Sequence, residues 1–156
     1  MRKNLLRAIV SVCAFAAVSA ALAGDNWMGS WKLDVGASIF SPGPAPTAQL
    51  LKIEADTEGI RVSSEIMDAQ GKMAQGSYVS EFDGKDVPWT GNPNADTSSA
   101  MRIDANSYEN TWKKEGKATI RAKVTVSKNG KTLTIRQTGA DAQGKLVDNT
   151  EVFRRM

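Results

Sequence analysis

Short runs of alternating apolar and polar residues, separated by turn signals, extend along most of the chain. The alternation is clearest in ATIRAKVTVS, residues 118–127, where Ile120, Ala122, Val124 and Val126 share one face. A period of two is typical of a β-strand with one buried face. The same criteria predict strands at 30–34, 49–55, 60–67, 73–82, 98–104, 107–114, 118–127, 132–138 and 146–154, with a further short strand near Val87.

Helical periodicity is not sustained in any window after Gly24, and a single helical turn is expected at 37–40. The turn signals DTEG, DAQGK, EGK and KNGK between the runs are typical of hairpins, because glycine permits the positive φ of a tight turn. Consecutive hairpins form a meander, and closing the meander removes two exposed edges. The pattern therefore predicts an all-β fold, a single antiparallel up-and-down β-barrel of about 8–10 strands.

The pentapeptide DAQGK occurs twice, at 68–72 and at 141–145, and chemically similar residues follow each copy. An old duplication and a turn solution used twice both explain this repeat. We favour shared turn chemistry without functional content.

The N-terminus has the features of a secretory signal peptide. Basic residues precede an apolar run from Ala8 to Leu22, which is too short to span a membrane, and ALA at 21–23 suits cleavage. We expect a signal peptide at 1–23 and one domain at 24–156, exported to the periplasm or secreted, and not integral to a membrane after cleavage.

Removal of this leader changes the charge and the available chemistry. Three of the 20 basic residues and none of the 17 acidic ones lie in it, so the exported chain is close to neutral and no nucleic-acid partner is expected. It contains no histidine, and the single cysteine, Cys13, lies in the leader. Triads with histidine and zinc sites are therefore excluded. We expect no metal, no cofactor and no enzymatic activity, although a catalytic constellation of another kind stays open.

Two connections are long. The proline-rich segment 35–47 follows the first strand, and DGKDVPWTGNPNAD occupies 83–96. Asn92, Asn94 and Asp96 alternate like calcium ligands, but the twelfth position is Ile103 where a glutamate is needed, so turn chemistry is favoured. Trp89 needs burial, which a cap on the core and a ligand contact would both provide.

The stretch GSWKLD, residues 29–34, resembles the glycine-x-tryptophan motif of lipocalins and the wider calycin group. The resemblance implies a lipocalin-like barrel in which Trp31 closes the base and a basic residue of the last strand packs over the indole. Arg154 and Arg155 are the candidates for that cation, and we assign Gly29, Trp31 and Arg154 to the barrel base. The resemblance also implies that segment 35–47 is a lid over one end of the barrel.

The chain after residue 23 also resembles a set of small exported bacterial proteins of uncharacterised function. The shared stretches are WKL, FSPGPAP, the DGKD and TGNP parts of 83–96, and SKNGKTLT at 127–134. This resemblance implies the same fold and export, and it carries no catalytic residues.

Inward-facing side chains of such a barrel form either a filled core or the wall of a cavity. Gln137 shares parity with Leu133 and Ile135, so we favour it over Arg136 as a polar anchor. The predicted ligand-binding residues are Tyr78, Phe82, Trp89, Trp112 and Gln137. The sequence predicts a binding protein for a small hydrophobic molecule held in the barrel interior. The alternatives are a filled barrel that acts through its surface, as an envelope interaction module or inhibitor, and an enzyme.

Overall fold

The structure, a computed structural model, describes residues 25–57 and 59–156, so the predicted signal peptide at 1–23 lies outside the described residues. Each predicted strand has a counterpart, and the short strand near Val87 is β5. The elements in chain order are β1 (Gly29–Leu33), the 3₁₀ turn η1 (Val35–Ala37), β2 (Ala48–Asp56), β3 (Gly59–Met67), β4 (Met73–Ser80), β5 (Asp83–Pro88), β6 (Thr97–Asp104), β7 (Ser107–Lys114), β8 (Lys117–Val126), β9 (Thr132–Ala140) and β10 (Leu146–Arg155). No helix in this part of the chain is long and apolar enough to cross a membrane.

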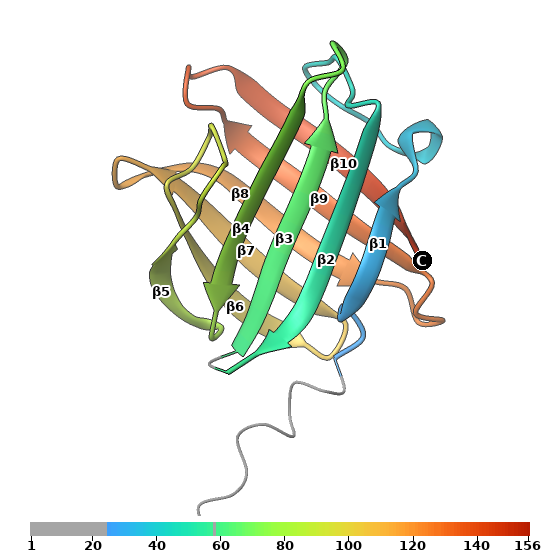
Figure 1. The fold of residues 1–156 in the computed structure, drawn as a ribbon. Coiled ribbons are helices and arrows are strands. Elements are labelled where there is room, and N and C mark those ends of the chain that lie inside the picture. The colour runs from blue at the N-terminus through green and yellow to red at the C-terminus, as the bar shows by residue number, and fades with distance from the viewer. Residues whose placement is uncertain (1–24, 58) are drawn as a thin grey trace, which may run out of the picture.

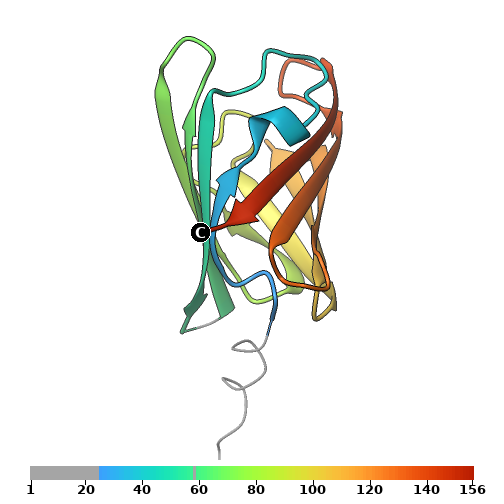
Figure 2. The same cartoon turned by 90° about the vertical axis from the view of Figure 1, so that its right-hand side faces the viewer.

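The ten strands form one antiparallel sheet with the order β4-β3-β2-β1-β10-β9-β8-β7-β6-β5. Consecutive strands are hydrogen-bonded neighbours except β4 and β5, and the first strand also pairs with the last, Leu33 opposite Phe153. The sheet curls into a barrel in both views (Figures 1 and 2). The predicted fold class, an all-β, antiparallel up-and-down barrel of about 8–10 strands, is confirmed.

The two outer strands of the sheet order, β4 and β5, meet at a narrow seam. Within the described residues, an isolated backbone bridge between Ser77 and Thr90, with N–O distances of 3.1 Å in both directions, joins β4 to the segment after β5. Glycines allow this approach, because a Cβ on Gly91 would lie 1.8 Å from the carbonyl oxygen of Gln75. A Cβ on Gly76 would lie 2.9 Å from the carbonyl oxygen of Thr90. The second long connection, 83–96, therefore closes the barrel through Thr90 and Gly91.

Aromatic rings fill the end of the barrel where β1 begins, which we call the base. Trp27 and Trp31 are completely buried, and the indole nitrogen of Trp31 donates to the carbonyl of Trp27 at 2.9 Å. Tyr108 and Phe82 pack on Trp27 with ring centroids 5.3 and 5.8 Å away. Arg102 lies over the Trp27 ring, 5.5 Å from its centroid, and pairs with Asp25. The base is thus a packed plug of aromatic rings.

The opposite end, the mouth, lies under the connection from η1 to β2, which crosses over it in Figure 2. This connection is tied to β10 by the bridge between Ile39 and Thr150 and by the Ser41 amide, which donates to Asn149 Oδ1 at 2.9 Å. At its other end the Thr47 amide donates to the Met67 carbonyl. Residues 38–47 therefore form a tethered lid.

The two DAQGK segments adopt the same turn. The Asp68 carboxylate accepts hydrogen bonds from the amides of Gln70 and Lys72 at 2.9 and 2.8 Å, and the Asp141 carboxylate accepts from the equivalent two amides at 3.0 and 2.8 Å. The glycines have φ of 79° and 82°. Both copies therefore form the turn that their shared residues predicted, and both explanations of the repeat are consistent with it.

Candidate ligand-binding cavity

A cavity of about 260 Å³ occupies the barrel interior on the mouth side of the aromatic plug. Its wall is formed by inward-facing residues of seven strands and by residues 92–94 of the loop after β5. The apolar part of the wall comprises Leu51, Val62, Ile66, Ile120, Ala122, Val124, Ile135 and Val147. The interior is therefore not filled by side chains.

Four of the five predicted ligand-binding residues line this cavity: Tyr78, Trp89, Trp112 and Gln137. The three aromatic rings form a chain, since the centroid of the Trp89 ring lies 4.8 Å from those of both Tyr78 and Trp112. Trp89 is partly buried and packs against the core as well as lining the cavity. The ring therefore caps the core and also borders the cavity, while its contact with a ligand stays a prediction.

Phe82 is the exception, and its predicted position in the cavity wall has to be corrected. The predicted strand 73–82 ends at Ser80, and Phe82 has a φ of 59°, so the alternation of inward and outward side chains breaks before it. The ring turns to the base, where it lies 5.2 Å from Tyr108 between centroids. It belongs to the aromatic plug.

Gln137 belongs to a row of residues that runs across four strands at one level of the barrel. The register places Asn110 opposite Ala122, Ala122 opposite Gln137, and Gln137 opposite Asn149. Asn110 Nδ2 donates to the Tyr78 hydroxyl at 2.6 Å. Asn149 Nδ2 donates to Gln137 Oε1 at 3.0 Å, and Asn149 also holds the lid. The row gives an apolar cavity a polar belt.

Arg136 lies on the outer face, where it pairs with Asp148. Gln137 is only 7% exposed. Gln137 therefore faces the interior and Arg136 the solvent, as parity predicted, while the role of Gln137 as a polar anchor for a ligand stays a prediction.

Glu151 on β10 is a buried acid that the sequence analysis missed. It is 5% exposed, lines the cavity, and also lines the recess beneath Phe40 and Pro44 of the lid. Burial raises the pKa of the Glu151 carboxyl to about 7, and a hydrogen bond from Gln137 partly opposes this. Its Oε2 has no hydrogen-bond partner. Glu151 lies two residues before the buried Phe153, so strand parity could have predicted that its side chain faces inward.

Two further polar atoms of the wall are buried without partners, Asn110 Oδ1 and Trp112 Nε1. The two tyrosines of the wall are neutral, since burial raises the pKa of Tyr78 to about 12 and that of Tyr108 well above its ordinary value. Buried polar groups are normally hydrogen-bonded, so these atoms are available to bond a molecule in the cavity.

The loop 89–96 is held by backbone and side-chain bonds. The Trp89 amide donates to the Asp96 carbonyl, and the Asp96 carboxylate accepts from the Glu115 amide, both at 2.9 Å. Asn92 Oδ1 accepts from the Asn94 amide at 2.9 Å, as in an Asx turn. Within 25–57 and 59–156, no three His, Cys, Asp or Glu side chains gather as metal ligands.

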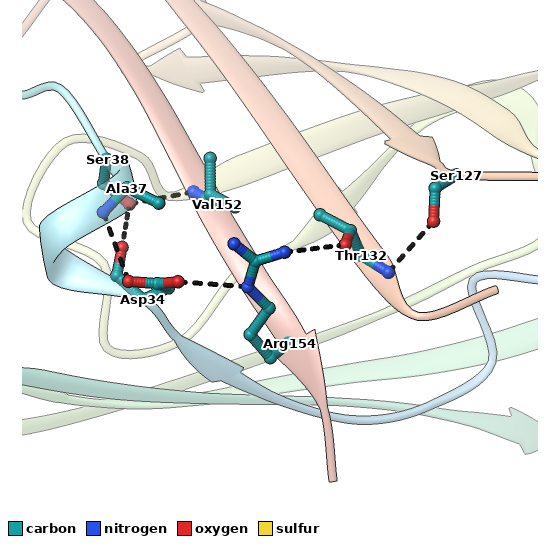
Figure 3. Close-up of polar contacts among 7 residues, drawn as sticks. All are labelled: Asp34, Ala37, Ser38, Ser127, Thr132, Val152 and Arg154. Carbon is teal, nitrogen blue, oxygen red and sulfur yellow. Dashed lines mark hydrogen bonds and ion pairs between the residues drawn. The ribbon is translucent and has the colours of Figure 1, made fainter. Parts of the chain in front are cut away.

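At the base, the cation over the Trp31 indole is Arg155, whose Cζ lies 4.1 Å from the ring centroid. The assignment of Arg154 to this contact is therefore corrected. Arg155 shares parity with Phe153 and faces inward, whereas Arg154 faces outward, with Nε 3.0 Å from Asp34 Oδ2 and Nη1 3.0 Å from Thr132 Oγ1 (Figure 3). Gly29 fits its predicted place, because a Cβ there would lie 2.6 Å from Arg155 Nη1.

No family model matches the sequence, and no curated protein matches it. Among solved structures, the barrel is similar to the crystal structure of zebrafish ileal bile acid-binding protein complexed with cholic acid. That similarity has a TM-score of 0.49 and 9% sequence identity, over 85% of this chain and 100% of the other. The fold of the present chain is accordingly defined by its own strand order and register.

Proposed function

We propose that this chain is an exported binding protein that holds a small, largely apolar molecule in the barrel interior. The observation that carries the proposal is the cavity of about 260 Å³, which has apolar walls and a buried polar belt at one level. Small-molecule sites combine these two features, since the walls supply affinity and a few polar groups orient the ligand.

Burial of ligand surface would drive binding, at about 25 cal/mol per Å² of apolar area. The cavity corresponds to roughly nine water volumes of about 30 Å³ each. A ligand that fits inside it therefore has about ten non-hydrogen atoms. Long-chain lipids would protrude under the lid. The proposed ligand is therefore a short amphiphile or a compact ring system.

The test is native mass spectrometry of the protein purified from its own compartment, together with titration of tryptophan fluorescence. Trp89 and Trp112 line the cavity, so an apolar ligand should change their emission. A co-purifying mass that alcohol probes displace supports the proposal. An empty protein whose emission no apolar probe changes contradicts it.

Export is proposed from the sequence alone, on the basic start, the apolar run and the ALA site of residues 1–23. N-terminal sequencing of the protein recovered from the periplasmic fraction tests it. A mature N-terminus at Gly24 is expected. An intact Met1 on protein in the cytoplasmic fraction would contradict export.

A surface role is the second candidate, and exposed apolar side chains near the mouth favour it. Ile39 of the lid is 66% exposed and Leu146 at the start of β10 is 79% exposed. Crosslinking in the source compartment separates the two functions. A specific crosslinked protein that is lost on Ile39→Ser would support the surface role.

A further inference from the structure

The described wall of the cavity carries one charged group, a carboxyl. Glu151 is the one charged side chain of its described wall, and no lysine or arginine is part of that wall. The basic residues of β8 and β9 alternate outward, with the Arg121 and Arg136 side chains 66% and 48% exposed. A bound anion would therefore lie near Glu151 without a counter-charge.

Glu151 is also incompletely paired. Gln137 donates to it, but Oε2 is buried without a partner. A buried carboxylate without a counter-charge is costly, and a cation at hydrogen-bond distance removes much of that cost. The free oxygen provides the place for such a contact.

The other groups near Glu151 would not repel a cation. The titratable side chains of the wall are otherwise Tyr78 and Tyr108, which are neutral, and Asp68 lies with Glu151 on the recess beneath the lid. A second unpaired acceptor, Asn110 Oδ1, also lines the cavity. Trp112 Nε1, a neutral group, is the unpaired donor of the described wall.

Aromatic faces add to this preference for positive charge. Trp89 lies between Tyr78 and Trp112 and lines the cavity. The faces of aromatic rings attract cations electrostatically, and the attraction is stronger where the cation is desolvated. The wall thus combines a carboxyl, an unpaired acceptor and aromatic rings.

We propose that the preferred ligand of this cavity is a small amphiphile with a protonated amine head, bound by Glu151 beneath the lid, and an apolar body. The inference rests on the proposed function and names the ligand class of the same site. An ammonium group offers three donors and no acceptor, which matches the free Glu151 oxygen. The apolar body would lie against Val62, Val124 and Ile135.

Three probes of matched length test the head group: octylamine, octanol and octanoate, each titrated calorimetrically into the protein at pH 8. We expect octylamine to bind at least tenfold more tightly than the other two. Glu151→Gln should weaken octylamine binding at least tenfold and change octanol binding less than threefold. Glu54→Gln, which removes a carboxylate paired with Lys52 on the outer face, is the matched control and should change neither.

Octanoate binding that equals or exceeds octylamine binding overturns the inference and leaves the proposed function standing. If none of the three probes binds, the proposed function itself fails, and the inference fails with it. If the Glu151→Gln variant does not fold, the affinities of the wild-type protein for octylamine and octanol are compared at pH 8 and pH 6 instead. Protonation of Glu151 should lower octylamine affinity about tenfold at pH 6, and an unchanged ratio of octylamine to octanol affinity overturns the inference.

Discussion

The two ends of the barrel use tryptophan in opposite ways. At the base, Trp27 and Trp31 are buried, and each has an arginine over its ring, Arg102 and Arg155. At the mouth, Trp89 and Trp112 border an empty volume, and no cation lies over either ring in the described part of the chain.

The difference separates two tasks. A ring whose faces are covered contributes packing and stability, whereas a ring beside a void has surface left for an occupant. The base is therefore packed for stability, and the mouth has the free ring surface that the proposed binding needs. The mouth also carries a carboxyl where the base carries guanidinium groups.

The largest expected effect is on stability at the base. Trp31→Ala should lower the free energy of unfolding by about 3–5 kcal/mol, because it empties a completely buried site. Trp89→Ala should lower it by about 1–2 kcal/mol, because its ring is partly exposed, and should weaken octanol binding. Urea denaturation measures both. Equal losses in the two variants would make Trp89 a core residue and remove the distinction between the ends.

The second effect is a pH dependence from Glu151. Its pKa of about 7 in the folded protein exceeds the 4.5 of the unfolded chain, so below pH 4.5 both states are protonated and no penalty applies. As the pH rises from 4.5 to 7, the unfolded chain ionises first and stability falls by about 3 kcal/mol, which stays lost above pH 7.

Glu151→Gln should abolish this fall and leave the rest of the pH profile unchanged. Thermal unfolding at half-unit pH steps measures the difference between the two proteins. Parallel profiles from pH 4.5 to pH 7 would show that Glu151 is not desolvated in the folded protein.

The third effect distinguishes two adjacent arginines. Arg155→Ala should cost about 2 kcal/mol, since it removes the contact with Trp31 and three hydrogen bonds to the carbonyls of Asn26, Met28 and Gly130. Arg154→Ala removes an exposed ion pair with Asp34 and should cost less than about 1 kcal/mol. A greater loss in Arg154→Ala by urea denaturation would contradict the corrected base contact.

The smallest effect concerns the seam. Gly91→Ala and Gly71→Ala both place a side chain at a φ near 78°, which costs about 1 kcal/mol in each case. Only at Gly91 does the new Cβ meet backbone, so this variant should lose at least about 1 kcal/mol more. Hydrogen exchange at the Ser77 and Thr90 amides should rise in Gly91→Ala alone. Equal exchange in both variants would show that the approach of the two glycines does not hold the seam.

Local patterns predicted most of the fold, because hairpins are specified by nearby residues. Alternation placed Ile120 through Val126 correctly, and parity placed Gln137 inside and Arg136 outside. Parity also holds for β10, where Phe153 identifies Glu151 and Arg155 as inward-facing. Strand parity could therefore have predicted the direction of both side chains. Glu151 was missed because acidic residues are rarely buried in a protein interior.

Other features depend on contacts that no local pattern encodes. Phe82 was misplaced because β4 ends at Ser80 and the ring lies beyond that end, at the base beside Trp27 and Tyr108. The bridge from Ser77 to Thr90 depends on the approach of two glycines from separate segments. The cavity depends on how closely seven strands pack around it, which residue types alone do not determine.

The pairing of β1 with β10 has a consequence for the order in which the molecule folds. Trp31 lies opposite Arg155, a separation of 155 − 31 = 124 residues, whereas the β7–β8–β9 hairpins join close neighbours. Contacts between distant segments close slowly, because chain entropy is lost before the contact forms. We expect the hairpins to assemble first and the barrel to stay open along the flank of β1 until the last strand docks. The contact of Arg155 with the Trp31 ring would then form among the last steps of folding.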